Sequence, residues 1–276
     1  MKRFLYSFSP PTLRLFARRL YFLPLDAYER ILAKKNGVIP PRGKILISRG
    51  DFIKTGERHL TYFQDLAGLQ PHHSVLDAGC GIGRIAMPLT RFLNKKGTYD
   101  GFDSVKNEID WCTKHISPKY PNFRFRFTGS FKKFNNTSHK TNKGNFVFPY
   151  DDERFDFVFF NSVFTHIMPA EVEQYLNETG RVMKSGATSL MFFYIVNCES
   201  EDLMIKRPTQ MNFPYNKGFY RLRSLQSDDK HVAYDEEWLL EKLSNAGLKM
   251  ESIKYGQWCG RKNYSDYQDL ILCRKS

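Results

Sequence analysis

Residues 75–84 read Val-Leu-Asp-Ala-Gly-Cys-Gly-Ile-Gly-Arg, and this stretch decides the fold. A short apolar run ends in the acid Asp77, glycines follow at 79, 81 and 83, and a helical pattern opens at Ile85. The pattern predicts a buried parallel strand, a tight turn and a helix whose N-terminus faces a bound ligand. Glycine suits such a turn because it adopts positive φ and lets a ligand approach the backbone.

The spacing of this loop distinguishes two kinds of nucleotide site. A dinucleotide fingerprint reads G-x-G-x-x-G with its acid about 20 residues later. Here position 84 is arginine, and the acid lies two residues before the first glycine. Asp77-x-Gly79-x-Gly81-x-Gly83 instead resembles the nucleotide loop of class I S-adenosylmethionine-dependent methyltransferases. The resemblance extends over about residues 70–275 and implies S-adenosyl-L-methionine as the cofactor.

A second acid follows where this fold needs one. Residues 98–103 read as a strand that ends in Asp103, 26 residues after Asp77. Ligands of a doubly wound sheet bind at the carboxyl ends of the strands, and a carboxylate there can accept hydrogen bonds from a ribose diol. Alternatively, Asp103 caps the following helix. We favour ribose binding, with Ser104 as the better cap.

The stretch 155–166, Phe-Asp-Phe-Val-Phe-Phe-Asn-Ser-Val-Phe-Thr-His, resembles the fourth-strand segment of small-molecule methyltransferases. The resemblance places Asn161 and Ser162 near the methionine half of the cofactor and His166 at the reaction pocket. Methyl transfer is an in-line displacement, so the protein aligns the nucleophile and, for a hydroxyl, removes its proton. His166 is the candidate base because imidazole titrates near neutral pH. A structural role for His166 remains equally open, and His231 is the second candidate.

The resemblance assigns cofactor contacts to residues that follow the first four strands. These residues are Asp77, Gly79, Cys80, Gly81, Gly83, Asp103, Ser104, Ser130, Asn161 and Ser162. Two positions depart from the family pattern. Residues 127–130 contain no acid for the adenine amino group, so a hydroxyl or the backbone would make that contact. Ser104 stands where a bulky apolar residue usually packs on adenine. No metal site is expected.

The alternation of patterns predicts an α/β fold. We expect a doubly wound, seven-stranded, mostly parallel sheet with a C-terminal antiparallel hairpin and helices on both faces. The expected strands are 74–79, 98–103, 123–128, 155–160, 188–196, 249–255 and 267–273, and the expected helices are 54–69, 83–94, 105–116, 169–184 and 236–246. Residues 1–50 would form a basic, aromatic extension, and residues 51–276 a methyltransferase domain with irregular insertions at 130–145 and 197–234.

The net charge of +13 is unevenly distributed. Residues 1–50 hold eleven Lys/Arg and two acids, a net of +9, so the remaining 226 residues carry only +4. A nucleic-acid methyltransferase would carry its positive surface around the mouth of the active site. The five cysteines form no C-x-x-C pair, which suits a reducing cytoplasm. No apolar run reaches the ~18 residues of a spanning helix.

The first 25 residues hold five Lys/Arg and no acid, interleaved with aromatic residues. From Leu13, apolar residues recur at helical spacing. Three interpretations remain open. We slightly favour a helix packed on the domain with its arginines outside. The alternatives are an amphipathic helix on an anionic membrane surface and a mitochondrial presequence, which Pro10-Pro11 would interrupt.

The second insertion combines aromatic residues with arginines, which predicts either a lid over an anionic acceptor or a local subcore. The residues are Met211, Phe213, Tyr215, Phe219, Tyr220, Arg221 and Arg223. Residues 212–215, Asn-Phe-Pro-Tyr, resemble the box with which amino methyltransferases hold a planar nitrogen. That box follows the fourth strand, near 161 here, so we regard the match as accidental. Its absence at 161 argues against an exocyclic base amine as acceptor.

We therefore expect a cytoplasmic S-adenosylmethionine-dependent methyltransferase that acts on a small-molecule, glycan or lipid-linked acceptor, at oxygen. Contact with a membrane surface through residues 1–25 is a further option. The alternative is an RNA methyltransferase or RNA-binding protein that uses the basic arm. A third class is a non-catalytic scaffold that binds the cofactor without turnover.

Overall fold

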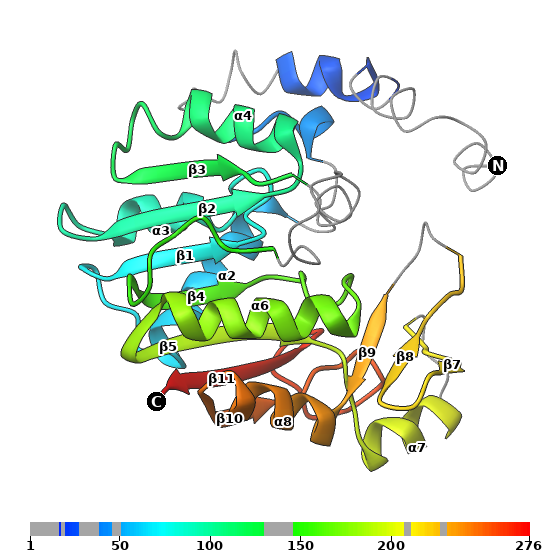
Figure 1. The fold of residues 1–276 in the computed structure, drawn as a ribbon. Coiled ribbons are helices and arrows are strands. Elements are labelled where there is room, and N and C mark those ends of the chain that lie inside the picture. Colours follow the sequence, from blue (N-terminus) through cyan, green and yellow to red (C-terminus); the bar gives the residue numbers. More distant parts are fainter. Residues whose placement is uncertain are drawn as a thin grey trace, which may run out of the picture.

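A seven-stranded sheet forms the centre of the protein, with strand order β10-β11-β5-β4-β1-β2-β3 (Figure 1). The computed structural model describes residues 17, 20–27, 39–45, 51–129, 146–206, 211–226 and 231–276. The strands are β1 (Ser74–Ala78), β2 (Thr98–Asp103), β3 (Phe123–Phe127), β4 (Phe155–Phe160), β5 (Met183–Phe193), β10 (Leu248–Lys254) and β11 (Asp269–Lys275).

Strands β1 to β5 pair in parallel, whereas β11 runs antiparallel to both β5 and β10. The predicted fold class is therefore confirmed, including the antiparallel pair formed by the last two strands. The chain order reverses between β1 and β4, where such sheets open a crevice at the carboxyl ends of their strands.

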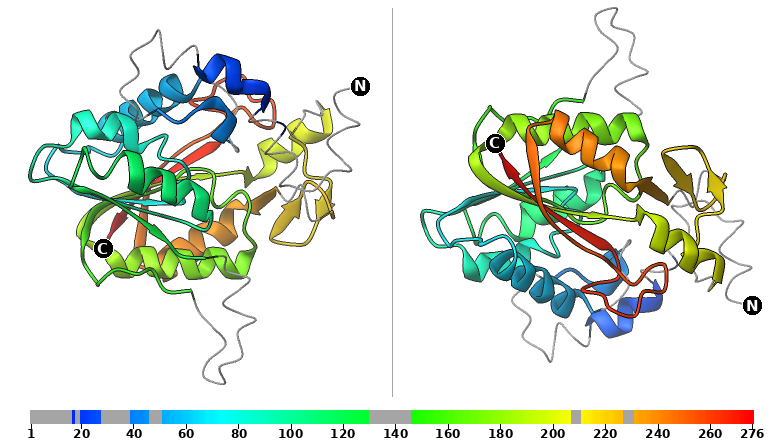
Figure 2. Two further views of the ribbon diagram at one scale, coloured as in Figure 1. Left: turned by 90° about the horizontal axis from the view of Figure 1, so that it is seen from above. Right: turned by 90° about the horizontal axis from the view of Figure 1, so that it is seen from below.

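Helices cover both faces of the large sheet (Figure 2). On one face lie α2 (Phe52–Asp65), α3 (Ala86–Phe92) and α4 (Lys106–His115), and on the other lie α6 (Pro169–Val182) and α8 (Glu236–Asn245). Strand β4 shows why both faces need cover: Phe157 and Phe159 belong to the core under α2, whereas Phe160 belongs to the core under α6 and α8. A strand buried on both faces reads as a continuous apolar run.

The fifth strand differs from its predicted bounds. It begins at Met183, directly after α6 ends at Val182, and Gly186 lies inside it with a φ of +76°. The sequence predicted that Gly186 would end the helix and that the strand would begin at 188. The strand begins five residues earlier than predicted, since Met183 already has β backbone angles.

The second insertion is more regular than the sequence predicted. It contains α7 (Cys198–Lys206) and most of a second, four-stranded sheet of order β6-β9-β8-β7. These strands are β6 (Ile195–Val196), β7 (Tyr215–Asn216), β8 (Tyr220–Leu222) and β9 (Val232–Asp235). The small sheet stands at the end of the large sheet toward which β1, β2 and β3 point (Figure 1). The first insertion, 130–145, lies outside the described residues.

Residues 20–27 of the N-terminal extension are helical. The carboxylate of Asp26 accepts the N–H groups of Arg42 and Gly43, at the short 3₁₀-helix η1 (Arg42–Lys44). The flanking residues Ile39 and Ile45 pack against the core, so this contact ties the helix to the domain. Four large apolar side chains of this helix are roughly half to three-quarters exposed, Leu20 55%, Tyr21 73%, Leu23 59% and Leu25 47%, whereas Phe22 is partly buried. Most of the apolar pattern that begins at Leu13 lies outside the described residues, so the packing of this segment on the domain stays a prediction.

All five cysteines are free, and Cys198 alone among them is exposed. Within the described residues no helix is long and apolar enough to cross a membrane.

Candidate functional site

The glycine loop turns over the end of β2. The N–H groups of Gly79 and Cys80 both donate to the carbonyl oxygen of Phe102, at 2.9 and 3.0 Å. Gly79, Gly81 and Gly83 have φ values of +92°, +52° and +77°. All three glycines thus adopt the left-handed backbone that other residues rarely take.

The three glycines differ in what surrounds them. A Cβ atom at Gly79 would lie 2.3 Å from a methyl group of Val163, and one at Gly83 would lie 2.8 Å from Ile116. At Gly81, Oε2 of Glu108 would lie 3.1 Å from the Cβ atom, and no other such neighbour within 4 Å is found among the described residues. Close packing thus requires glycine at 79 and 83, whereas at Gly81 the carboxylate of Glu108 occupies the space beside the backbone.

Asp103 holds the loop in place. Its Oδ2 accepts the N–H of Gly81 at 2.9 Å, and its Oδ1 accepts the N–H of Val105 at 2.8 Å. Each oxygen keeps a second lone pair that a ligand hydroxyl can use. Ser104 is exposed and caps nothing, because Val105 is the N-cap residue of α4 and makes no side-chain cap. The prediction that Ser104 caps this helix was wrong.

Asp77 and Cys80 support the loop from within. Asp77 is 1% exposed, and the hydroxyl of Tyr99 donates to its Oδ2 at 2.6 Å. Burial, with a smaller contribution from the charge of Asp103, raises the pKa of Asp77 to about 8. Burial also raises the pKa of the Cys80 thiol. Both groups are therefore protonated at neutral pH, and Asp77 does not line the crevice.

Sequence reasoning missed Glu108, which lies in the first turn of α4 and is only 5% exposed. Burial raises its pKa to about 7, the nearby charge of Asp103 adds to the shift, and Arg84 opposes it. A glutamate in a polar helical stretch reads as a solvated residue. Only the approach of α4 to the glycine loop reveals its position.

The end of β4 is tied to two distant elements. Ser162 has a φ of +63°, and its hydroxyl donates to Oε1 of Gln268 at 2.9 Å. The amide of Asn161 lies 3.1 Å from Nε2 of His59, on α2. His59 and Gln268 were also missed, because their partners lie about a hundred residues away.

His59 fixes how Asn161 presents its amide. Nδ1 of His59 donates to the carbonyl oxygen of Thr55 at 2.7 Å, and burial lowers the pKa of the ring. A neutral ring with its proton on Nδ1 can only accept at Nε2. Oδ1 of Asn161 is the atom placed beside Nε2, and turning the amide by 180° would give this acceptor the NH₂ group and leave the amide oxygen for another donor.

The structure brings both candidate histidines together. His166 follows β4 and is exposed, His231 directly precedes β9, and their ring centroids lie 4.5 Å apart. The ring of Tyr194 lies 6.3 Å from that of His231. The backbone hydrogen bond from Val232 to Thr165, at 2.9 Å, joins the two loops that carry the histidines. The second insertion therefore completes this side of the site.

The aromatic residues of the insertion divide between a subcore and the surface. Met211 and Phe213 are buried in a cluster with Tyr194 and Trp258, while Tyr215 and Phe219 are 41% and 44% exposed. Arg221 pairs with Glu201. A pocket of about 360 Å³ lies between α7 and β7–β8, lined by Glu201, Met204, Ile205, Asn212, Phe213, Pro214 and Arg221. It belongs to the insertion and not to the crevice at the glycine loop.

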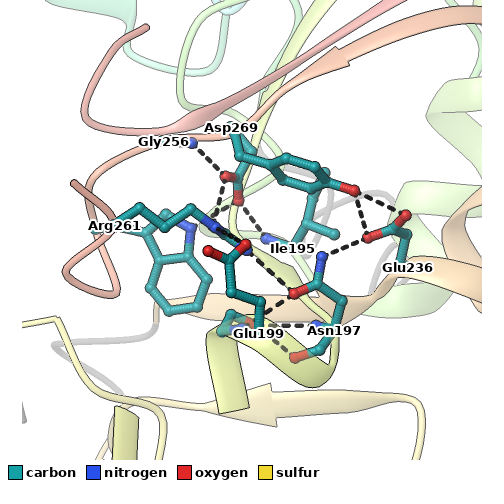
Figure 3. Close-up of polar contacts among 10 residues, drawn as sticks. Ile195, Asn197, Glu199, Glu236, Gly256, Arg261 and Asp269 are labelled. Carbon is teal, nitrogen blue, oxygen red and sulfur yellow. Dashed lines mark hydrogen bonds and ion pairs between the residues drawn. The ribbon is translucent and has the colours of Figure 1, made fainter. Parts of the chain in front are cut away.

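A buried polar network joins the insertion to the large sheet (Figure 3). Asp269, at the start of β11, accepts the N–H groups of Ile195 and Gly256, both at 2.6 Å, and the indole N–H of Trp258 at 2.7 Å. Arg261 pairs with the same carboxylate at 3.4 Å. Burial raises the pKa of Asp269 to about 6, although these donors oppose the shift.

Arg261 also reaches the insertion. Its guanidinium pairs with Glu199 at 2.9 Å and donates to Oδ1 of Asn197 at 3.1 Å. Asn197 in turn donates to Glu236, at the start of α8, at 2.8 Å. The segment 258–261 therefore connects the large sheet with α7 and α8.

Two further expectations concern Ser130 and a metal site. Ser130 lies outside the described residues. Among the residues that are described, no group of three or more His, Cys, Asp or Glu side chains could hold a metal ion.

Comparison with known families finds a match over residues 75–186, to the family described as a methyltransferase domain. The matched segment begins in β1 and ends in β5. It therefore contains the glycine loop, Asp103 and the loop that follows β4.

Three solved structures share the fold at low sequence identity. The PH0226 protein from Pyrococcus horikoshii matches with a TM-score of 0.58 at 15% identity, over 91% of this chain and 99% of that chain. A SAM-dependent methyltransferase from Methanosarcina mazei matches with a TM-score of 0.50 at 18% identity, over 75% and 94%. A putative methyltransferase from Haloferax volcanii, solved in complex with the Trm112 methyltransferase activator, gives 0.52 at 13%, over 80% and 90%.

Proposed function

The chain contains a class I, Rossmann-like S-adenosylmethionine-dependent methyltransferase domain, and from this premise we propose that it transfers a methyl group to a hydroxyl of a small-molecule, glycan or lipid-linked acceptor. We assign residues 51–276 to this domain and residues 1–50 to an extension. The observation that carries the proposal is the left-handed glycine loop at the end of β1, whose Gly81 N–H donates to the Asp103 carboxylate at the end of β2.

The residues at the crevice fit the cofactor. Gly81 would let the nucleoside approach the backbone, because it has no side chain of its own. Asp103 would accept a ribose hydroxyl through its remaining lone pairs. With its NH₂ group turned toward Nε2 of His59, Asn161 would offer its amide oxygen to the ammonium group of the methionine half. Gly79, Cys80, Gly83 and Asp77 shape the loop, and Ser162 orients the chain after β4 through Gln268.

The bound cofactor supplies an activated methyl group on a sulfonium. The chain then has to align the acceptor and remove the proton of its hydroxyl. We assign proton removal to His166, with His231 beside it to share the charge that His166 gains. Tyr194 and the insertion would hold the acceptor against this pair.

The charge distribution supports an acceptor other than a nucleic acid, because the 226 residues after the extension carry a net charge of only +4. The ion pair between Arg221 and Glu201 also reduces the positive charge that the insertion offers to a phosphate. RNA methylation through the basic arm remains the alternative that the experiments below address.

Cofactor binding is the first test. Calorimetry with S-adenosylhomocysteine should show binding by the wild type and weaker binding by Asp103→Ala, since a hydrogen bond to a charged group contributes about 1.5–3 kcal/mol. Asp110→Ala is the matched control, because Asp110 lies on α4 and is 54% exposed. A wild-type protein that does not bind the ligand at millimolar concentration contradicts the proposal.

We also propose that residues 20–27 contact an anionic membrane surface. Four exposed apolar side chains on a helix within the most basic part of the chain support this contact. Vesicles of phosphatidylcholine with added phosphatidylglycerol should sediment the wild type, and Leu20→Glu with Leu23→Glu should abolish sedimentation. Ile205→Glu is the control, since Ile205 is 80% exposed but lies on α7. Salt-dependent RNA binding that the same double variant abolishes would instead favour the alternative function.

A further inference from the structure

Glu108 carries a buried carboxylate that the roles assigned so far do not use. It is 5% exposed and takes part in no hydrogen bond or ion pair with the residues that the structure describes. Its Oε2 points at Gly81, 3.1 Å from where a Cβ atom would stand. Buried polar groups are normally paired, so such a carboxylate requires an explanation.

A glutamate at this position of a helix usually caps the helix N-terminus, but here another residue takes that role. Glu108 is the third residue of α4, where a capping-box glutamate would accept the N–H of the N-cap residue. That residue is Val105, and its N–H goes to Oδ1 of Asp103 at 2.8 Å. An acid in the first turn also interacts favourably with the helix dipole, but a solvated side chain would do so without being buried.

The surroundings of Glu108 offer no charged partner within ion-pair distance. Arg84 faces it from the end of the glycine loop, yet its guanidinium lies over the ring of Phe52, 5.8 Å from the centroid. Asp103 approaches from β2 with a like charge. The thiols of Cys80 and Cys112 also lie nearby, and burial raises the pKa of both, so they stay neutral. The protein thus holds an acid where its charge is unfavourable.

We propose that Glu108 accepts one hydroxyl of the cofactor ribose, next to Asp103. The proposal rests on the function proposed above. A ribose diol offers two donors, and both oxygens of Asp103 already accept a backbone N–H. The two carboxylates approach Gly81 from two elements: Asp103, at the end of β2, accepts its N–H, and Glu108, on α4, lies beside the position of the missing Cβ atom.

This arrangement links cofactor affinity to pH. A hydroxyl that donates to Glu108 stabilises its ionised form, and burial has raised its pKa to about 7. S-adenosylhomocysteine should therefore bind more tightly as the pH rises through about 7. The charges of Asp103 and Arg84 and the thiols of Cys80 and Cys112 face Glu108 as well, and the thiols stay neutral because burial raises their pKa.

Calorimetry with S-adenosylhomocysteine on either side of pH 7 tests the proposal. Glu108→Leu removes the acceptor and should weaken binding roughly tenfold or more and flatten the pH dependence. Glu108→Gln keeps a neutral acceptor, so it should bind with intermediate affinity and without the pH dependence. Asp110→Asn, on the exposed side of the same helix, should match the wild type.

Thermal unfolding without ligand separates this role from a structural one. Removal of an unfavourable buried charge should stabilise the free protein, so Glu108→Gln should melt at a higher temperature than the wild type above pH 7. A variant that is more stable and yet binds less tightly identifies a group kept for the ligand.

The outcomes are distinguishable. A wild type that binds while Glu108→Leu binds equally well, with the same pH dependence, overturns the role of Glu108 and leaves the proposed function intact. A Glu108→Gln protein that melts lower and binds as well as the wild type identifies a structural residue instead. A wild type that does not bind S-adenosylhomocysteine overturns both proposals.

Discussion

Gly79 and Gly68 share a left-handed backbone but not their surroundings. Gly79 has a φ of +92° and would clash with Val163, while Gly68 has a φ of +64° and has no neighbour within 4 Å of an added Cβ atom. Gly68→Ala should cost about 1–2 kcal/mol, the penalty of the left-handed conformation alone. Gly79→Ala should cost more and also weaken S-adenosylhomocysteine binding. Urea unfolding and calorimetry measure both effects, and equal losses would contradict the assigned packing role.

His166 is the residue whose replacement should affect chemistry more than binding. For any acceptor that the wild type methylates, His166→Ala should lower kcat by about 10²–10⁴, the usual contribution of a general base. Affinity for S-adenosylhomocysteine should stay the same, because His166 lies on the acceptor side of the loop after β4. Ala substitution of His115, on the last turn of α4, serves as the control. An unchanged kcat would identify His166 as structural.

At the level of single residues, the sequence predicted the local backbone where the signal is local. The spacing of the glycines after Asp77 predicted a strand, a tight turn and a helix, and the structure has β1, a turn with three left-handed glycines and α3 there. Glu108 and His59 gave no such signal, because their meaning comes from contacts with Gly81 and Asn161 that only the folded chain creates.

At the scale of the elements, we expect substitutions in the polar network around Asp269 (Figure 3) to lower the free energy of unfolding most. Arg261→Ala leaves the buried carboxylate of Asp269 without its cation, and the loss of one partner of a buried pair costs about 3–5 kcal/mol. Three N–H groups still donate to Asp269 in this variant, so we expect a loss of unfolding free energy at the lower end of this range. Urea unfolding measures it.

Arg274→Ala provides the comparison. Arg274 pairs with Glu251, and these side chains are 48% and 31% exposed, so its loss should cost less than about 1 kcal/mol. Similar losses for Arg261→Ala and Arg274→Ala would mean that the network contributes little to holding the insertion.

Long apolar elements were predictable, and short ones were not. The bounds of β2 and β4 agree with those predicted, because mainly apolar segments of six residues are followed by polar residues. The small sheet was missed because its strands are two to four residues long, which is too short for an alternating pattern to appear. These strands form by pairing with one another, β6 and β8 with β9 and β7 with β8, and not from local preference.

Across the whole molecule, buried acids should set the pH dependence of stability. Burial raises the pKa of Asp77 to about 8, of Glu108 to about 7 and of Asp269 to about 6. The folded protein therefore keeps protons that the unfolded chain releases, and the free energy of unfolding falls as the pH rises through about 4–8. His59, whose pKa is lowered, acts in the opposite direction only below its ordinary value of 6.5.

The melting temperature should accordingly decrease from about pH 6.5 to about pH 8.5, where His59 no longer contributes. Asp77→Asn should make the curve flatter, since it removes the acid with the highest of these pKa values. Thermal unfolding of the ligand-free protein measures both. A melting temperature that stays constant or rises over this range would contradict the raised pKa values, because acids that are already ionised in the folded state take up no protons on folding.

The burial of four cysteines leaves one thiol within reach of reagents. Burial raises the pKa of Cys80, Cys112, Cys259 and Cys273, whereas Cys198 is exposed as the first residue of α7. A maleimide dye should therefore attach at Cys198 alone, without any engineered mutation. Placed beside Asn197 and Glu199, the fluorophore would report when an acceptor shifts the insertion, and so turn the wild-type protein into its own sensor for screening compounds.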